Sequence, residues 1–139
     1  MDNKGFSYFE HPSDIGIECL GNTLQELLVH AAMALYGLMI DVVLLQEKES
    51  YKIEINAVDA EDLFSQWIGE LIFHAHAHHL FFIRFEFQIF SETCITATAF
   101  GQKSDDSVRM QSEVKGITYH NYSVTKSDTT WQARFIIDV

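Results

Sequence analysis

Residues 59–91 read DAEDLFSQWIGELIFHAHAHHLFFIRFEFQIFS, and within this stretch the spacing of the apolar side chains changes from helical to extended. Asp59 is a good N-cap, and the apolar residues after it recur every three to four positions to about His78. From Leu80 to Ser91 they recur at every second position. The stretch therefore predicts a helix over 60–78 that leads directly into a strand. The residues expected on one face of that strand are Phe81, Ile83, Phe85, Phe87 and Ile89.

The same two patterns recur on both sides of this stretch. Thr23, with Glu26 three residues later, forms a capping box, and helical spacing continues from there to about Ile40. Two helices among runs of strands, with no Pro/Gly-rich linker, predict an α+β fold. We expect a single domain over residues 1–139, with two main helices packed on a mixed or antiparallel β-sheet. The extended segments expected outside residues 59–91 are 6–10, 14–20, 51–55, 93–102, 110–114, 117–126 and 131–139.

The charge of the chain limits the partners that it can bind. Nine Lys and Arg residues against twenty Asp and Glu residues leave a formal net charge of −11. Tight binding to RNA or DNA needs several cationic side chains on the phosphates, and the sequence contains no basic cluster. We therefore expect no strong direct nucleic-acid binding. An acidic surface suits a basic protein partner, and the alternative is that the charge only keeps the protein in solution.

The composition indicates the cellular compartment of the protein. The hydrophobic content is 47% with a single proline, as in a folded domain. No apolar run reaches the ~18 residues that a membrane span needs, and residues 1–5 lack the apolar segment of a signal peptide. Cys19 and Cys94 fall in strand-like segments and are expected to be reduced core residues. We expect a cytoplasmic protein that does not bind a membrane.

The two ends of the chain carry groups that could bind a cation. The chain stops on an apolar strand, with the side chain of Asp138 and the main-chain carboxylate of Val139 at its end. Near the other end, His11 and Asp14 stand at the start of another strand-like segment. If the two strands pair side by side, these groups converge and suit a hard cation such as calcium. The alternative is an aspartate at a strand end that faces water.

A second cluster consists of histidines at the end of the helix over 60–78. His74 and His78 are one helical turn apart and could share a soft or borderline metal ion. The alternative is a C-terminal helix cap, in which an imidazolium meets the negative end of the helix dipole. The full cluster is His74, His76, His78 and His79.

Residues 114–122, VKGITYHNY, form a third group of chemically useful side chains. Lys115 and His120 could meet a phosphate or a carboxylate, and the alternative is an ordinary strand with solvated polar residues. Elsewhere the sequence has no G-x-x-x-x-G-K-[ST] phosphate loop, no G-x-S-x-G elbow and no H-E-x-x-H zinc helix. These signatures of common enzyme classes are therefore missing.

Taken together, six segments resemble the archease family, and they occur in the family's order over essentially the whole chain. The segments are HPSDIG at 11–16, the run over 21–41, DLFSQWIGELI at 62–72, ATAFG at 97–101, EVKGITYH at 113–120 and RFIIDV at 134–139.

The resemblance implies an accessory function. Archeases activate the 3′-phosphate RNA ligase that joins tRNA exons and repairs broken RNA, and they are not ligases themselves. They promote guanylylation of the active-site histidine of that ligase and allow it many turnovers. The resemblance therefore implies that the partner of this chain is a protein, the ligase.

The resemblance also assigns site residues. The metal-binding groups of the family map onto Asp14, Asp138 and Val139, with His11 and Asp41 as near neighbours. Calcium is the cation that the family suggests, and its preference for oxygen ligands fits this set. The residues expected to contact or activate the ligase are Lys115 and His120.

Two other functions compete with this expectation. The first is a small metal-dependent hydrolase that uses Asp14, Asp138 and His120, because a bound metal can activate water. The sequence supplies no defined substrate pocket or phosphate cradle for it. The second is a general protein chaperone, although the sequence shows no long exposed apolar segment.

Overall fold

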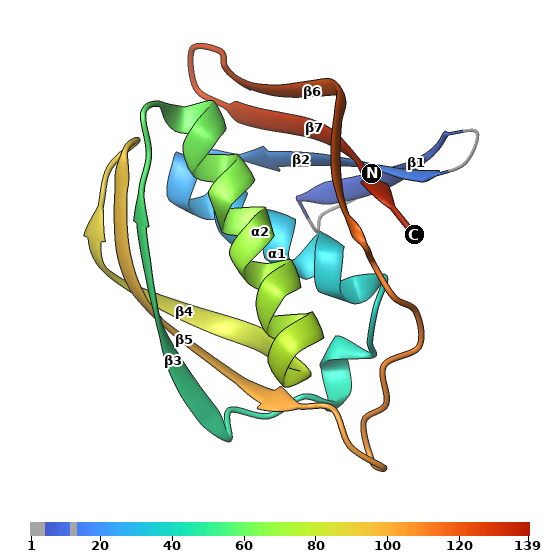
Figure 1. Ribbon diagram of the computed structural model, residues 1–139. Helices are drawn as coiled ribbons and strands as arrows, with labels where there is room; N and C mark the ends of the chain where they lie inside the picture. Colours follow the sequence, from blue (N-terminus) through green and yellow to red (C-terminus); the bar gives the residue numbers. More distant parts are fainter. Residues whose placement is uncertain (1–4, 12–13) are drawn as a thin grey trace.

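Two antiparallel β-sheets enclose two helices in this computed structural model, which describes residues 5–11 and 14–139. One sheet has the strand order β1-β2-β7-β6 and the other the order β3-β5-β4. The prediction of an antiparallel α+β fold with two packed helices is confirmed. The elements are β1 (Phe6–His11), β2 (Asp14–Gly21), α1 (Leu24–Gly37), the 3-10 helix η1 (Val42–Leu44), β3 (Glu49–Asn56), α2 (Ala60–His78), β4 (Leu80–Phe90), β5 (Cys94–Lys103), β6 (Gly116–Lys126) and β7 (Trp131–Asp138) (Figure 1).

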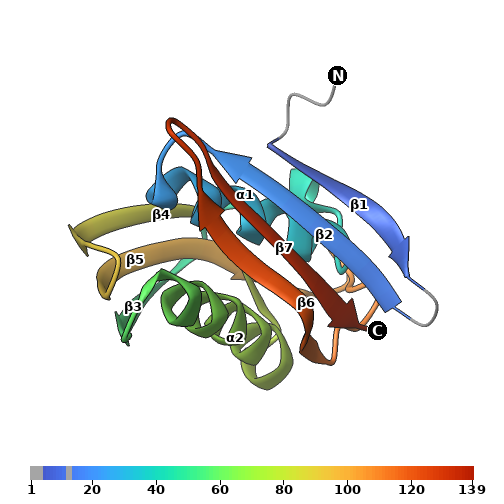
Figure 2. The ribbon, with the colours of Figure 1, turned by 90° about the horizontal axis from the view of Figure 1, so that it is seen from above.

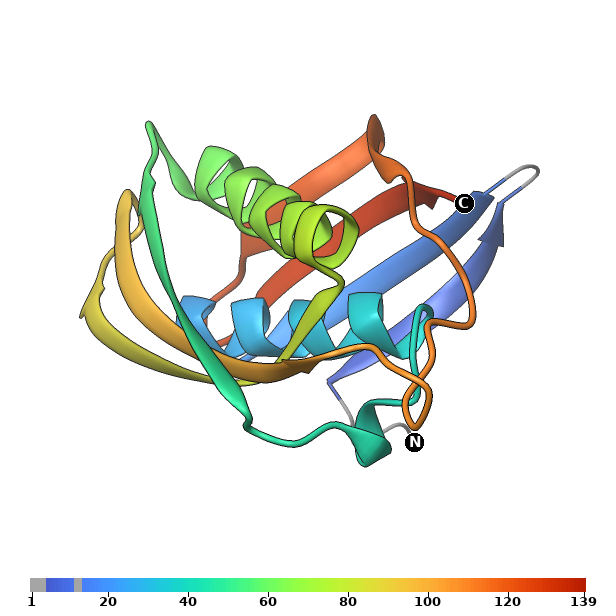
Figure 3. The same ribbon diagram turned by 60° about the horizontal axis from the view of Figure 1, so that its bottom comes forward.

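The division of the strands between two sheets was not indicated by the sequence. Helix α1 contacts β1 and β2 of one sheet and β4 of the other, while α2 contacts β6 on one side and β3 and β4 on the other (Figure 3). Each helix therefore closes one side of the space between the sheets. The physical reason is visible in α1, where the fully buried Ala34 and Tyr36 are two positions apart and therefore lie on nearly opposite sides of the helix. Such a helix is apolar over more than one stripe and needs cover on more than one side.

Both helices begin at the residues that the sequence indicated. The hydroxyl of Thr23 accepts a hydrogen bond from the Glu26 amide (3.0 Å), and the Asp59 carboxylate accepts one from the Asp62 amide (2.8 Å). Helix α2 ends at His79, which adopts a left-handed conformation with φ of 53°. Neither helix of the described residues has the combination of length and apolar character needed to cross a membrane.

Helix α1 is shorter than expected, because it ends at Gly37 rather than near Ile40. Ile40 instead forms an isolated antiparallel bridge with Met110. The extended segment expected over 110–114 reduces to this bridge, and the chain from 111 to 115 has no strand. The bridge directs the loop after β5 back toward the end of α1.

Side-chain hydrogen bonds tie the helices to each other across the core. The indole N–H of the buried Trp67 donates to the Leu28 carbonyl (2.9 Å), and the Tyr36 hydroxyl donates to the Leu71 carbonyl (2.9 Å). Both polar groups are thereby satisfied in an apolar surrounding, where a missing partner would be costly. The pairs hold α1 and α2 in a fixed relation between the sheets.

The expected alternation of β4 is wrong in detail. Its pairing with β5 shifts register between Phe82 and Arg84 and again between Phe87 and Ile89. Each β-bulge inserts one residue and reverses the faces of those that follow. As a result Ile83 and Ile89 are exposed, although they were expected on one face with the buried Phe81, and Phe82 is buried.

Candidate functional site

The last strand of the chain lies beside the second strand in the four-stranded sheet. Strand β7 pairs antiparallel with β2, and Ile15 stands opposite Ile137. The next position along this ladder places Asp14 across from Asp138. On the outer sides, Asp14 pairs with His11 of β1, and Asp138 pairs with Gly116 of β6. The end of β7 therefore lies beside the start of β2, as Figure 2 shows, and the predicted pairing of the terminal strand with the strand that begins at Asp14 is confirmed.

The two aspartates share the outer face of this sheet. Side chains alternate along a strand, and directly opposite residues point to the same face. Ile17 is fully buried against the helices, whereas Glu18 and Arg134 form an ion pair (3.0 Å) on the other face. Asp14 and Asp138 have the same parity as Glu18 and Arg134 in the two strands. They therefore stand away from the helices, with Asp138 exposed and Asp14 half-buried.

Lys115 lies directly beside this end of the sheet. Its backbone N–H donates a hydrogen bond to the Asp138 carbonyl (2.7 Å). The side chain of Val114 before it is fully buried, and Lys115 itself is exposed. The fold therefore brings Lys115 next to Asp138, two residues that are 23 positions apart in the sequence.

This end of the sheet offers oxygen ligands, which hard divalent cations prefer. They are the carboxylates of Asp14 and Asp138 and the main-chain carboxylate of the following residue, Val139. Within residues 5–11 and 14–139, no group of three or more His, Cys, Asp and Glu side chains could by itself hold a metal ion. The His11 side chain lies outside the described part, so its expected contribution stays a prediction. A calcium site at this end of the sheet stays a prediction.

Asp41 has a different contact. Its carboxylate accepts a hydrogen bond from the Val43 amide (3.3 Å) and so caps η1. A carboxylate in this position stabilises the start of a helical turn. This observed contact is structural, and a role for Asp41 near the cation stays a prediction.

His120 lies in a bulge of β6 and is not paired in line with Asp14 and Asp138. The pairing of β6 with β7 shifts between Thr118 and Ser123, and Asn121 adopts a left-handed conformation with φ of 56°. The bulge is anchored to α2, since the Tyr122 hydroxyl donates to the Glu61 carbonyl (2.6 Å). Burial raises the pKa of this hydroxyl, which keeps it protonated as a donor. His120 itself is exposed.

The four histidines of α2 have separate surroundings. His74 is 2% exposed, and its Nε2 lies 3.6 Å from a carboxylate oxygen of Glu70. The ring packs against Tyr51 and is tilted relative to the His78 ring, with centroids 5.5 Å apart. Burial lowers the pKa of His74 and favours its neutral form.

The remaining two histidines connect α2 to its surroundings. His79 ends the helix through its backbone, because its N–H bonds to the His74 carbonyl. His76 lies on another face, and its Nε2 is 2.6 Å from the Val114 carbonyl. This contact fixes the residue before Lys115. Sequence reasoning missed it, because no local pattern links two residues that are 38 positions apart.

Both cysteines are unpaired, as expected. Cys19 is buried, and burial together with the nearby Glu18 carboxylate raises the pKa of its thiol to about 12. Cys94 is half-buried rather than a core residue. Neither forms a nucleophilic pair with a described base.

Comparison with known proteins gives a consistent result. The profile of the archease protein family (MTH1598/TM1083) matches residues 6–139. Protein archease of Methanothermobacter thermautotrophicus is 30% identical over 139 residues, which cover 98% of this chain and 99% of that protein. Protein archease of Pyrococcus abyssi is 31% identical over 141 residues, with coverages of 98% and 99%.

Solved structures agree with this result. The solution structure of Methanobacterium thermoautotrophicum protein 1598 superposes with a TM-score of 0.80 at 28% identity, and the match covers 98% of this chain and 99% of that one. The crystal structure of an archease from Thermotoga maritima, described as a possible chaperone, gives a TM-score of 0.67 at 20% identity and covers 94% of both chains. The second likeness concerns the fold alone.

Proposed function

The chain belongs to the archease family, and on this premise we propose that it is an accessory protein that activates the 3′-phosphate RNA ligase of tRNA splicing and RNA repair. It promotes guanylylation of the ligase and multiple turnover. A divalent cation, calcium or one that resembles it, binds at the ends of the chain through Asp14, Asp138 and Val139. The protein acts in the cytoplasm, where reducing conditions suit its two unpaired cysteines.

One observation carries this proposal, the pairing of β2 with β7. It brings Asp14 beside Asp138 and leaves the last residue of the chain at the same edge. Two like charges on neighbouring strands repel each other, and a divalent cation between them would remove this repulsion. The arrangement supports a cation site in which the chain terminus itself is a ligand.

Lys115 is the residue best placed to act on the ligase. Its backbone is held from two sides, by the Asp138 carbonyl and by the contact of His76 with the preceding Val114. The exposed ammonium is thereby presented next to the proposed cation, and His120 is exposed further along β6. Activation then requires that this charged end bind one state of the ligase more tightly than the other, since equal affinity would shift nothing.

The charge of the chain supports a protein as the target. A net charge of −11 opposes direct binding to RNA phosphates. It favours rapid docking to a protein that binds RNA, because such a protein exposes Lys and Arg side chains. In this division of work, the ligase holds the RNA and the accessory protein contacts the ligase.

The test is a guanylylation assay with the ligase of the same organism. We expect Asp14→Ala and Asp138→Ala to abolish stimulation while the fold is retained, because the cation loses a ligand in each case. Asp128→Ala is the matched control. Asp128 is an exposed aspartate in the turn between β6 and β7, and this turn lies at the opposite end of the hairpin from Asp138. If both site variants stimulated the ligase at the wild-type rate, the proposed cation site would have no role in activation.

The terminal carboxylate can be tested separately. Extending the chain beyond Val139 converts this carboxylate into an amide, which carries no charge. We expect weaker calcium binding by isothermal titration calorimetry than for a chain extended at the other end. Equal calcium affinities for the two extended chains would show that Val139 is not a ligand.

A general chaperone function is the second candidate, because the related Thermotoga maritima protein is described as a possible chaperone. It predicts that the purified chain suppresses aggregation of unrelated unfolded proteins at stoichiometric amounts. Ligase activation predicts that the chain stimulates the ligase and does not suppress the aggregation of unrelated proteins. Measuring both with the same preparation distinguishes the two functions, and turnover of a phosphate ester by the chain alone would instead indicate a hydrolase.

A further inference from the structure

We infer that the apolar groove between α1 and β4 is a second contact with the ligase, one that takes a large apolar side chain from a basic segment of the ligase surface. The inference rests on the proposed function and extends it. In this arrangement the charged end of the sheet acts on the ligase, and the groove supplies affinity.

The outer face of α1 is unusually apolar for a helix at a protein surface. A surface helix normally carries charged and polar residues on its solvent side. Helix α1 contains one acidic residue, Glu26, and no Lys or Arg. Beside Glu26 and His30, its solvent side presents the half-buried Val29 and, one turn later, Met33, which is 45% exposed. Contiguous apolar surface of this kind marks contact sites for other proteins.

The groove beside this face has the size of one side chain. Its volume is about 170 Å³. An apolar cavity of about 150 Å³ holds a benzene molecule, whereas sites for cofactors and small-molecule ligands span roughly 300–1,000 Å³. A single aromatic or branched aliphatic side chain therefore fits, as in the anchored contacts that dominate many protein interfaces. The lining includes Val29, Met33 and Tyr36 of α1, Val42 of η1, and Phe82 and Ile83 of β4.

A β-bulge forms the wall of the groove on the β4 side. The register shift between Phe82 and Arg84 leaves Ile83 outside the regular pairing, where it lines the groove and is 36% exposed. Strand β4 is the edge of its sheet, but bulges hinder the addition of another strand to an edge. The partner therefore engages the groove through a side chain and not by extending the sheet.

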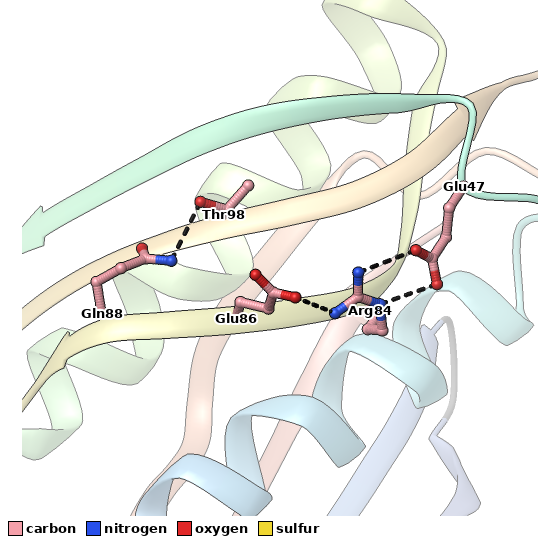
Figure 4. A network of polar contacts seen from close by, with 5 residues as sticks. All are labelled: Glu47, Arg84, Glu86, Gln88 and Thr98. Atoms are coloured by element: carbon pink, nitrogen blue, oxygen red, sulfur yellow. Dashed lines mark hydrogen bonds and ion pairs between the residues drawn. The ribbon is translucent and has the colours of Figure 1, made fainter.

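Charges on β4, the strand that lines one side of the groove, favour a basic partner. The guanidinium of Arg84, which follows Ile83, is held by the Glu47 carboxylate at 2.9 and 3.0 Å and by the Glu86 carboxylate (Figure 4). Two carboxylates on one guanidinium leave a local excess of one negative charge, in a chain whose net charge is −11. An enzyme that binds RNA carries Lys and Arg near its RNA path, so its surface is complementary to the negative charge of Glu47 and Glu86.

The test measures the affinity of the chain for the purified ligase and the concentration that gives half-maximal stimulation of guanylylation. We expect Met33→Glu and Ile83→Glu each to raise both values at least fivefold, which corresponds to about 1 kcal/mol of binding free energy. Ile89→Glu is the matched control, because Ile89 lies on the same strand, beside the second register shift, and is 55% exposed. Met33→Ala tests the loss of the side chain without an added charge.

Three results would overturn the inference. Groove variants that bind and stimulate like the wild type would exclude the groove as a contact. Equal weakening by Ile89→Glu would show a general effect of added negative charge. A dimer of the chain alone that Met33→Glu dissociates, with ligase affinity unchanged, would assign the groove to self-association.

The two proposals fail in different ways. If the wild-type chain does not stimulate the ligase, the proposed function fails and the inference fails with it. If the wild type stimulates and the groove variants match it, only the groove inference fails. Asp138→Ala is expected to abolish stimulation at every concentration, whereas the groove variants are expected to reach the wild-type stimulation when their concentration is raised.

Discussion

Replacing Asp138 by Asn should stabilise the cation-free protein and destabilise the calcium-loaded protein relative to wild type. Asp138 stands opposite Asp14 by the β2–β7 register, at a spacing of about 5 Å between Cβ atoms. Two carboxylates roughly 6 Å apart in a water-like dielectric repel each other by about 0.7 kcal/mol, and salt near 0.15 M halves this value approximately. Asn has nearly the same shape and no charge. The cation-free variant should therefore be more stable by about 0.3–0.7 kcal/mol.

Calcium should reverse this order. A ligand that binds only the folded state at 100 times its Kd stabilises it by about 2.7 kcal/mol. The wild type should gain this amount, whereas Asp138→Asn, which has lost a charged ligand, should gain much less at the same calcium concentration. The wild type would then exceed the variant by about 2 kcal/mol, the difference between these two effects.

Urea denaturation measures the free energy of unfolding of both proteins, once with EDTA and once with calcium. Asp128→Asn is the control, because it removes an exposed aspartate at the opposite end of the β6–β7 hairpin from Asp138 and should respond to calcium as the wild type does. If the cation-free Asp138→Asn protein were less stable than wild type, the carboxylates would not repel each other as the register implies. If calcium stabilised both proteins equally, Asp138 would not be a ligand.

Three further predictions concern the core and the pH response. Trp67→Phe should lower the free energy of unfolding by about 2–4 kcal/mol in urea denaturation, because it leaves a gap and removes the hydrogen bond to the Leu28 carbonyl. An unchanged urea midpoint would show that Trp67 does not stabilise the core in this way. Folded His74 stays neutral while the unfolded state gains a proton below about pH 6.5, so stability should fall with pH from there to the lowered folded pKa. His74→Phe should flatten this part of the curve, and identical pH profiles would exclude His74 as the cause. A thiol reagent should modify Cys94 in the native protein and reach Cys19 only after unfolding, which mass spectrometry can verify.

Local chemistry made much of the fold predictable. Thr23 and Asp59 marked the starts of both helices, because a side-chain oxygen must satisfy amides that have no partner in the first turn. The strand-like segments at both ends of the chain were also confirmed as β2 and β7. The capping and alternation signals lie within a few residues of one another, so they can be read from sequence alone.

Bulges and long-range contacts were not predictable in the same way. Ile83 and Ile89 were expected on one face of β4 with Phe81, Phe85 and Phe87, and two register shifts separate them from that face. A bulge leaves the order of apolar residues in the sequence unchanged and alters only which face they occupy. The contact of His76 with the Val114 carbonyl likewise depends on how α2 lies against the segment before β6.

The element types, the unpaired cysteines, the acidic character and, through short motifs, the family could all be predicted from the sequence. Only the tertiary structure decided that the strands form two sheets around the helices, that Asp14 stands across from Asp138, and that a groove opens beside Met33. Hydrogen bonds and apolar spacing within one element are local properties. Strand register, bulges and the gap between a helix and a sheet arise from packing among residues far apart in the chain, and no local pattern specifies them.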